Sequence, residues 1–175
     1  QNEEYGGHGV DFRYSTLIYH ELLRAGFAAL GVGFAVHSDL VANYIGHYGS
    51  EEQKRRILPK MARGEWIGAI AMTEPGTGSD LASVQTKAEL KDGKWIINGQ
   101  KTFISNGIHS DIVIVVARTD ASPEKPYAGI SLFIVERDAK GFSRGRRLGK
   151  IGLHAQDTAE LAFENCEIPQ DNLLG

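Results

Sequence analysis

The spacing of apolar residues changes near residue 65, and this change constrains the fold more than any other feature of the sequence. Before it, apolar residues recur at the three- and four-residue intervals of an amphipathic helix, whereas after it short apolar runs alternate with turn residues, as in strands. The first part predicts helices over residues 14–25, 34–48 and 51–57. We therefore expect an α+β chain in which a helical segment, residues 1–65, precedes a β domain, residues 66–175.

Local signals place the ends of the third helix. Ser50 and Gln53 have the spacing of a capping box, in which each side chain bonds the other residue's main-chain N–H. Pro59 lacks an N–H group and clashes with the preceding turn inside a helix. The pattern therefore predicts that the helix ends near Ile57 and that a short turn starts at Pro59.

Turn residues divide the second part into about seven strands. Asp92-Gly93 predicts a hairpin, and Asn98-Gly99 and Asn106-Gly107 predict further turns, since these pairs tolerate positive φ. The near-continuous apolar runs at 112–117, 130–135 and 159–163 predict buried strands. Strands this closely spaced leave no room for crossover helices, so we expect an antiparallel sandwich or closed barrel.

Composition excludes some classes of protein. The 175 residues carry a net charge of −3 and one cysteine, Cys166. This balance gives no basic footprint for nucleic acid, and the single cysteine allows no internal disulfide and fits a reducing compartment. No apolar run looks long enough for a membrane span. Because the chain starts at Gln1 and stops at Gly175 just after a strand-like segment, we expect a piece of a longer protein.

The loop Thr73–Asp80 is the first candidate site. Pro75, Gly76 and Gly78 break the preceding apolar run, and hydroxyl and carboxylate side chains crowd the turn. Glycines let a ligand approach the backbone closely, and consecutive amides can bind an anion. No Gly-Lys-Ser/Thr sequence follows, so the loop is not a P-loop. The alternative is an ordinary surface turn.

The segment 100–107 is the second candidate. In a regular strand Phe103 and Ser105 point to the same face, which suits a flat heteroaromatic ring with polar edges. The alternative is a core phenylalanine beside a turn serine.

Other motifs favour structural roles. The six histidines lack metal-ligand spacing, and Gly31-Val32-Gly33 lacks the third glycine of a dinucleotide fingerprint. Cys166 is expected to be a small buried hydrophobe, and the arginines at 144, 146 and 147 to form a solvated strand edge.

Together the two candidate segments resemble the acyl-CoA dehydrogenase family. Ala71-Met72-Thr73-Glu74-Pro75 through Gly78-Ser79-Asp80 is similar to one family signature, and Asn98-Gly99-Gln100-Lys101 with Phe103–Gly107 is similar to a second. The resemblance covers essentially the whole chain, and Val36-His37-Ser38 and Gln156–Leu161 look most like the long-chain type.

The resemblance implies an FAD site between this β domain and a C-terminal helical domain that is missing here, in a homotetramer or dimer. It implies that Ile70, Ala71, Met72 and Thr73 edge the flavin, that Gly78 and Ser79 lie along the cofactor chain, and that Phe103, Ile104 and Ser105 lie against the ring. It implies that Ser79, Lys125 and Pro126 contact the acyl-CoA substrate.

The resemblance further implies FAD-dependent α,β-dehydrogenation of acyl-CoA thioesters to trans-2-enoyl-CoA, with electron-transferring flavoprotein as acceptor. The family's base is a glutamate of the C-terminal domain, so we assign no catalytic residue and expect the 175 residues alone to be inactive and to hold FAD weakly. The location would be a bacterial cytoplasm or a mitochondrial matrix. The alternatives are a flavin oxidase or monooxygenase on the same scaffold, or a non-catalytic binding or assembly module.

Overall fold

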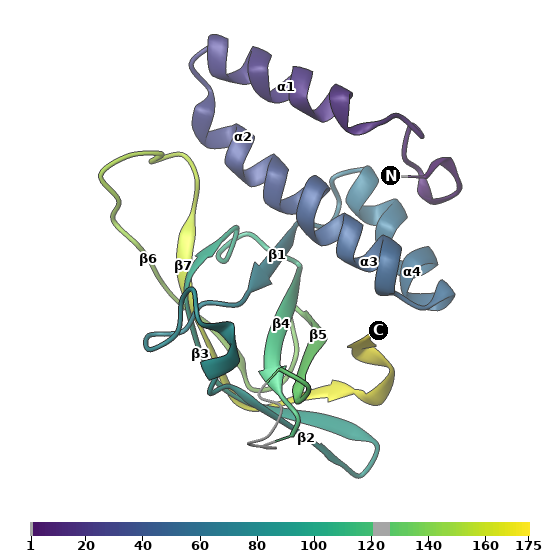
Figure 1. The fold of residues 1–175 in the computed structure, drawn as a ribbon, viewed down its shortest axis with the longest axis vertical. Helices are drawn as coiled ribbons and strands as arrows, with labels where there is room; N and C mark the ends of the chain where they lie inside the picture. The colour runs from purple at the N-terminus through teal and green to yellow at the C-terminus, as the bar shows by residue number, and fades with distance from the viewer. Residues whose placement is uncertain (1, 121–126) are drawn as a thin grey trace.

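A layer of helices covers one side of a curled sheet in the computed structural model, which describes residues 2–120 and 127–175. In Figure 1, α1 is the outermost helix, and α2 to α3 run as one continuous rod between it and the strands. The helical elements are η1 (Glu3–Tyr5), α1 (Phe12–Arg24), α2 (Ala28–Phe34), the π-helical η2 (Ala35–Val41), α3 (Ala42–Tyr48), α4 (Glu51–Ala62), η3 (Leu81–Ser83) and η4 (Gln170–Asn172).

Helix α4 begins as predicted and ends later than predicted. The main-chain N–H of Gln53 donates to Ser50 Oγ at 3.2 Å, and the N–H of Ser50 donates to Gln53 Oε1 at 2.9 Å, so the capping box is confirmed. The predicted end near Ile57 is wrong, because α4 runs through Pro59 to Ala62. Proline removes one helical hydrogen bond, but Leu58 and Met61 on either side of it are buried against the sheet and hold the helix in register.

The second part is a β domain, as the change of spacing near residue 65 predicted, and it forms eight strands. They are β1 (Gly68–Ala71), β2 (Lys87–Lys91), β3 (Lys94–Ser105), β4 (Ile112–Arg118), β5 (Ile130–Glu136), β6 (Phe142–Arg147), β7 (Thr158–Pro169) and β8 (Leu173–Leu174). Their order in one sheet is β6-β7-β3-β2-β4-β5-β8, with β1 paired to β4. Most pairs are antiparallel, whereas β4 pairs in parallel with β1 and with β2.

The turn predictions divide into two groups. Asp92 and Gly93 have positive φ and join β2 to β3, and Asn106 has a φ of 62° at the end of β3, so both of these turns are confirmed. The turn predicted at Asn98-Gly99 is wrong. Those residues lie inside β3, where the pairing with β7 shifts between Ile97 and Gly99, so the sequence makes a bulge there.

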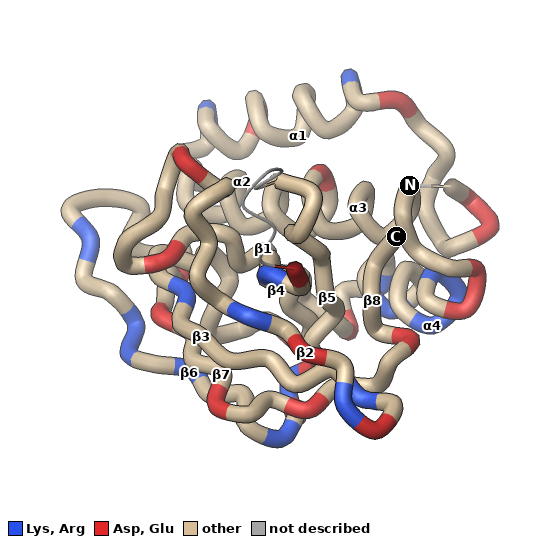
Figure 2. The backbone as a smooth tube through the Cα atoms, turned by 60° about the horizontal axis from the view of Figure 1, so that its bottom comes forward, with Lys and Arg blue, Asp and Glu red and all other residues tan. Residues whose placement is uncertain are grey.

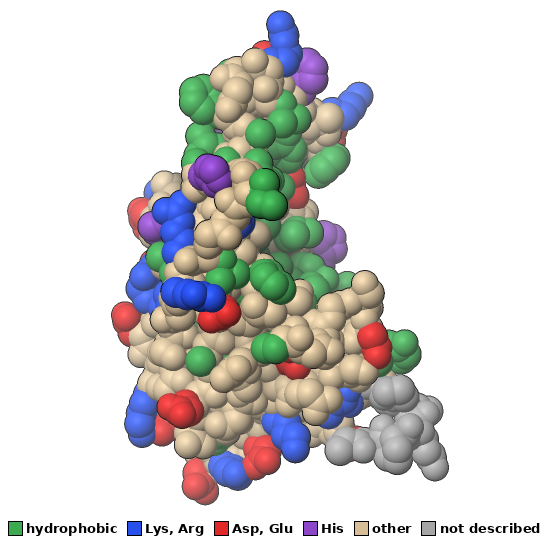
Figure 3. Space-filling model, turned by 90° about the vertical axis from the view of Figure 1, so that its left-hand side faces the viewer, with side chains coloured by type: hydrophobic (Ala, Val, Ile, Leu, Met, Phe, Trp, Pro, Cys, Tyr) green, Lys and Arg blue, Asp and Glu red, His purple; other side chains and the backbone are tan. Residues whose placement is uncertain are grey.

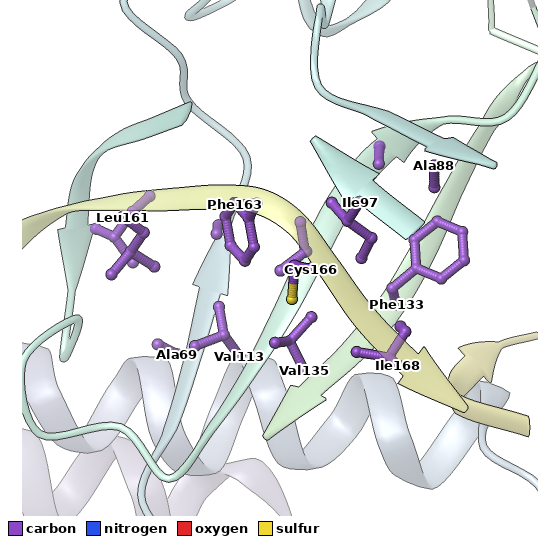
Figure 4. Close-up of a cluster of buried hydrophobic side chains, with 14 residues drawn as sticks. Ala69, Ala88, Ile97, Val113, Phe133, Val135, Leu161, Phe163, Cys166 and Ile168 are labelled. Atoms are coloured by element: carbon purple, nitrogen blue, oxygen red, sulfur yellow. The ribbon is translucent and has the colours of Figure 1, made fainter. Parts of the chain in front are cut away.

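Strand β4 shows how the sheet serves two cores. Val113 and Val115 point into an inner cluster, whereas Ile112 and Ile114 face a second cluster beneath the helices. The inner cluster draws side chains from β1, β2, β3, β4, β5 and β7, which is possible only because the sheet curls on itself (Figure 4). A continuous apolar run is therefore the pattern of a strand buried on both faces.

The helical rod carries apolar residues on its open side as well. Residues Ala28–Tyr48 form a helix of 21 residues that is, by length and composition alone, apolar enough to cross a bilayer. The sequence analysis had predicted no run of this length. Ser38, Asp39 and Asn43 interrupt the apolar residues, but the helix continues past them through η2. Core helices of soluble proteins meet the same criterion, so it is weak evidence for a span. Figure 3 shows apolar side chains gathered over this helical part.

Candidate functional site

The loop Thr73–Asp80 leaves β1 and folds into a tight turn. The N–H of Glu74 donates to Thr77 O at 2.9 Å, and the N–H of Thr77 donates to Glu74 O at 3.1 Å. Thr77 is buried and its hydroxyl donates to Ser83 O at 3.1 Å, whereas Gly78 and Ser79 are exposed. The loop therefore has an inner side held by protein contacts and an open side available to a ligand.

The carboxylate of Glu74 is buried and has three donors. It accepts from the main-chain N–H of Gln85 at 2.7 Å, from the N–H of Thr86 at 2.9 Å and from Lys101 Nζ at 2.9 Å. Burial raises the pKa of Glu74, but the hydrogen bonds from Thr86, Gln85 and Lys101 outweigh burial and leave that pKa below its ordinary value. Glu74 is thus an anionic anchor of the loop.

Lys101 is the cation that faces this carboxylate. Its side chain is fully buried, and Nζ donates to Met72 O at 3.0 Å as well as to Glu74. Burial lowers the pKa of Lys101, and the hydrogen bond and negative charge of Glu74 oppose that shift. The paired charges compensate part of the cost of removing each of them from water.

The two candidate segments lie side by side, although they are almost thirty residues apart in the sequence. Besides the two bonds from Lys101, the N–H of Thr102 donates to Thr73 O at 2.9 Å. The end of β1 and the middle of β3 are thereby joined at Met72, Thr73 and Glu74. The resemblance implied that the two segments border one flavin, and the structure places them side by side.

Phe103 has an unusual backbone and an exposed ring. Its φ is 58° and its exposed fraction is 67%, within the register shift of β3 against β7 between Lys101 and Ile104. The simple alternation expected for Phe103 and Ser105 is interrupted here, because Lys101 and Thr102 are both buried. A left-handed φ costs a bulky residue about 1–2 kcal/mol. The alternative of a core phenylalanine is wrong.

The other site candidates differ in accessibility. Met72, Thr73 and Ser105 are half-buried, and Ile70 packs against the cluster beneath the helices. Ala71 and Ile104 are buried in the inner cluster, so only their main-chain groups can face a ligand. Lys125 and Pro126 lie outside the described residues.

A polar junction that the sequence did not predict connects α2 to this region. Asn106 Nδ2 donates to Gly33 O and to Gly68 O, both at 3.1 Å, and Gln156 Nε2 donates to Asn106 Oδ1 at 2.9 Å. Gly33, Asn106 and Gln156 border a cavity of about 320 Å³ that His37 and Phe34 also line. Asn106 was predicted only as a turn residue, because its partners are distant in the sequence and leave no local pattern.

His37 fixes the start of β1. Its Nδ1 accepts from the N–H of Gly68 at 3.1 Å, so Nε2 carries the proton and donates to Met61 O at 3.2 Å. Burial lowers the pKa of His37, and the bond to Met61 opposes that shift. The neutral imidazole therefore holds the strand against the helical layer.

Two other sequence expectations can be compared with the structure. Cys166 is buried, and desolvation raises the pKa of its thiol to about 12, as expected for a structural residue. Arg144 is not a solvated edge residue, because its guanidinium donates to Gly107 O at 3.0 Å and to Ser110 O at 2.8 Å. Arg146 and Arg147 are exposed, and Figure 2 shows basic positions following β6 and the connection to β7.

The open side of the joined segments fits a flat cofactor with a long polar chain. At Gly78 an added Cβ would meet no protein atom within 4 Å, so nothing in the described chain fills that space. The exposed Phe103 ring offers a stacking face, and Thr73, Ser79 and Ser105 are at least partly exposed, so their hydroxyls are accessible donors. Among residues 2–120 and 127–175, no group of three His, Cys, Asp or Glu side chains could hold a metal ion.

Comparison with known proteins decides the family. Residues 69–166 match the model of the acyl-CoA dehydrogenase middle domain, and residues 1–65 match the model of the N-terminal domain. The chain belongs to the acyl-CoA dehydrogenase family. The resemblance carried by the two loop segments is confirmed.

Similar proteins come from animals and bacteria. The long-chain specific acyl-CoA dehydrogenase of Sus scrofa, described as mitochondrial, is 52% identical over 99% of this chain, and an acyl-CoA dehydrogenase of Bacillus subtilis is 45% identical over 99%. The chain spans only 40% and 45% of those two proteins.

Solved structures agree with this relationship. Acyl-CoA dehydrogenase from Geobacillus kaustophilus matches 100% of this chain with a TM-score of 0.96 and 54% identity, and this chain covers 46% of it. An acyl-CoA dehydrogenase from Bacillus anthracis, solved in complex with FAD, matches 99% with a TM-score of 0.88 and 37% identity, and this chain covers 29% of it.

Proposed function

We propose that the whole protein containing this chain catalyses FAD-dependent α,β-dehydrogenation of acyl-CoA thioesters to trans-2-enoyl-CoA. The observation that carries the proposal is the joining of the two loop segments by Lys101 and Thr102 in a chain of this family. The exposed Phe103 ring and the open space at Gly78 support a flat cofactor with a long chain on this side. The FAD complex of the Bacillus anthracis relative supports the choice of cofactor.

Each residue of the open side has a role in this proposal. Thr73 and Ser105 hydrogen-bond the edge of the flavin, and Phe103 packs on its face. Gly78 and Ser79 lie along the cofactor chain, and Ser79 also contacts the acyl-CoA. Ala71 and Ile104 contribute main-chain groups only, since their side chains are in the core. Ile70 and Met72 complete the flavin edge, and Lys125 and Pro126 keep their assignment to the CoA moiety.

FAD supplies the acceptor for the hydride that leaves the β-carbon. The described residues bind and orient it and exclude water from one side of it. Glu74 is not the base that removes the α-proton, because its two oxygens are occupied by Gln85, Thr86 and Lys101 and its side chain is only 4% exposed. We assign the base to a helical domain outside these 175 residues. Within the present chain we place the boundary between the helical segment and the β domain at residue 65.

The relatives support the proposed substrate and the two compartments considered. The pig relative supports long-chain acyl-CoA as substrate. We propose electron-transferring flavoprotein as the acceptor and a homotetramer or dimer as the assembly. Relatives described as mitochondrial and relatives from bacteria both match, so the matrix and the bacterial cytoplasm are the two compartments considered.

Anaerobic reduction of the whole protein tests the proposal. The purified protein is mixed with saturated acyl-CoA esters of increasing chain length while the visible absorption of FAD is followed. We expect the flavin to be bleached and a 2-enoyl-CoA to form, most efficiently with long chains. FAD that stays oxidised with every ester would contradict the proposal. Rapid oxygen consumption without electron-transferring flavoprotein would instead identify a flavin oxidase.

A further inference from the structure

Lys101 is an unusual residue for the inside of a β domain. Lysine is almost never fully buried unless it is paired, because its charge loses hydration. Here the side chain is completely buried, with Nζ 2.9 Å from Glu74 Oε1 and 3.0 Å from Met72 O. An apolar side chain at this position of β3 would fill the same space without the desolvation cost. The ammonium is therefore expected to have a role other than packing.

The bond to Met72 fixes the direction of one peptide group. The described chain contains no cis peptide, so the C=O of Met72 and the N–H of Thr73 point in opposite directions across their shared bond. Since the carbonyl is turned toward Lys101, the N–H of Thr73 is turned away from it. No described residue accepts a hydrogen bond from that N–H, whereas Thr73 O is already bonded to Thr102.

Glu74 fixes the position of the ammonium itself. The carboxylate is held by the amides of Gln85 and Thr86, and Glu74 also closes the tight turn with Thr77. Lys101 Nζ therefore lies between Met72 O and a carboxylate that main-chain amides hold in place. The amino group cannot shift without breaking one of them.

The same lysine precedes the strained segment of β3. The register of β3 against β7 shifts between Lys101 and Ile104, and Phe103 lies in that interval with a φ of 58°. Burying Lys101 anchors the strand immediately before the point at which Phe103 turns outward. One side chain is thus connected to the free N–H of Thr73 on one segment and to the exposed ring on the other.

We propose that Lys101 is a positioning residue for the flavin, which aims the main-chain N–H of Thr73 at the flavin edge and holds the Phe103 ring against its face. The inference rests on the proposed function, since it takes FAD as the occupant of the open side. Lys101 itself does not contact the cofactor. It acts through Met72, Glu74 and the register shift of β3 between Lys101 and Ile104.

The test compares FAD binding and flavin spectra in the whole protein. Lys101→Met removes the ammonium and keeps the carbon stem, and Lys101→Met/Glu74→Gln removes both charges so that none is left buried and unpaired. Asn172→Ala is the matched control, because Asn172 is a buried polar residue that donates to Ile134 O at 2.8 Å. Flavin fluorescence gives the dissociation constant, and visible absorption and the midpoint potential report the environment of the ring.

We expect both Lys101 variants to bind FAD about 2- to 10-fold more weakly, the change that corresponds to losing one neutral hydrogen bond from a misdirected Thr73 N–H. The absorption maximum and the midpoint potential of the remaining bound flavin should shift. Asn172→Ala should lower the melting temperature and leave both flavin properties unchanged. If the double variant folds and binds FAD with the original affinity, spectrum and potential, the inference is overturned. A wild-type protein that binds no FAD overturns the proposed function instead.

Discussion

Lys101 and Glu74 form a buried ion pair across the base of the candidate site, with Nζ and Oε1 separated by 2.9 Å and exposed fractions of 0% and 4% for the two side chains. They lie on different segments, β3 and the loop after β1. The pair connects the stability of the β domain to the geometry of its open side.

Glu74→Ala should strongly destabilise the protein. It leaves the Lys101 ammonium and the amides of Gln85 and Thr86 without their acceptor, and removing one partner of a buried pair costs about 3–5 kcal/mol. Urea unfolding followed by circular dichroism measures the loss. Glu89→Ala is the control, because Glu89 pairs with Lys91 on the surface, and it should not change the unfolding midpoint measurably. Equal midpoints for the two variants would show that the buried pair carries no stability.

Phe103→Gly should separate folding from binding. Glycine adopts a φ of 58° without the strain that phenylalanine bears, which relieves about 1 kcal/mol, while removal of an exposed ring costs little packing. We expect the melting temperature of the apoprotein to stay constant or rise and the affinity for FAD to fall. Phe133→Ala leaves a cavity in the inner core, which typically lowers the free energy of unfolding by about 3–5 kcal/mol, so this variant should have a lower melting temperature. A destabilised Phe103→Gly apoprotein would mean that the ring has a packing role.

Local chemistry determined which parts of the fold were predictable. Asp92-Gly93 specifies a hairpin by itself, and the alternate burial of β4 follows from one apolar run. Lys101 could not be recognised, because a lysine in a strand is usually solvated and its partner Glu74 is distant in the sequence. The helix end predicted from Pro59 was wrong because the local signal was clear but tertiary contacts of Leu58 and Met61 override it.

The site was predictable to a similar extent. Thr73–Asp80 and Phe103 were identified from turn and aromatic residues, but the left-handed φ of Phe103 depends on a register shift against β7. The burial of Ile104 follows from the same shift. The junction of Asn106 with Gly33 and Gln156 joins three distant segments, and no single window of sequence contains it.

His37 should make the stability of the protein depend on pH below neutrality. Burial lowers its folded-state pKa below the ordinary 6.5, so the unfolded chain takes up the proton more readily. The stabilisation is complete above about pH 6.5 and is lost as the pH falls through the lower folded pKa, because a proton on Nδ1 removes the acceptor of Gly68 N–H. His37→Gln should reduce the slope of unfolding free energy against pH in this range. Identical slopes for the variant and the wild type would refute the assignment.

Gly76 and Gly78 offer a matched pair that tests the open side of the loop. Neither has a positive φ, and an added Cβ meets no atom within 4 Å at either position, so the protein alone tolerates alanine at both. Each substitution should leave apoprotein stability unchanged or raise it by about 0.4–1 kcal/mol by restricting the unfolded chain. If the cofactor chain lies along Gly78, then Gly78→Ala places a methyl group against it and weakens FAD binding, whereas Gly76→Ala does not. Titration of each apoprotein with FAD gives the two dissociation constants. Unchanged melting temperatures would show that both variants are folded. Equal dissociation constants in two folded variants would then mean that the cofactor chain does not lie along Gly78.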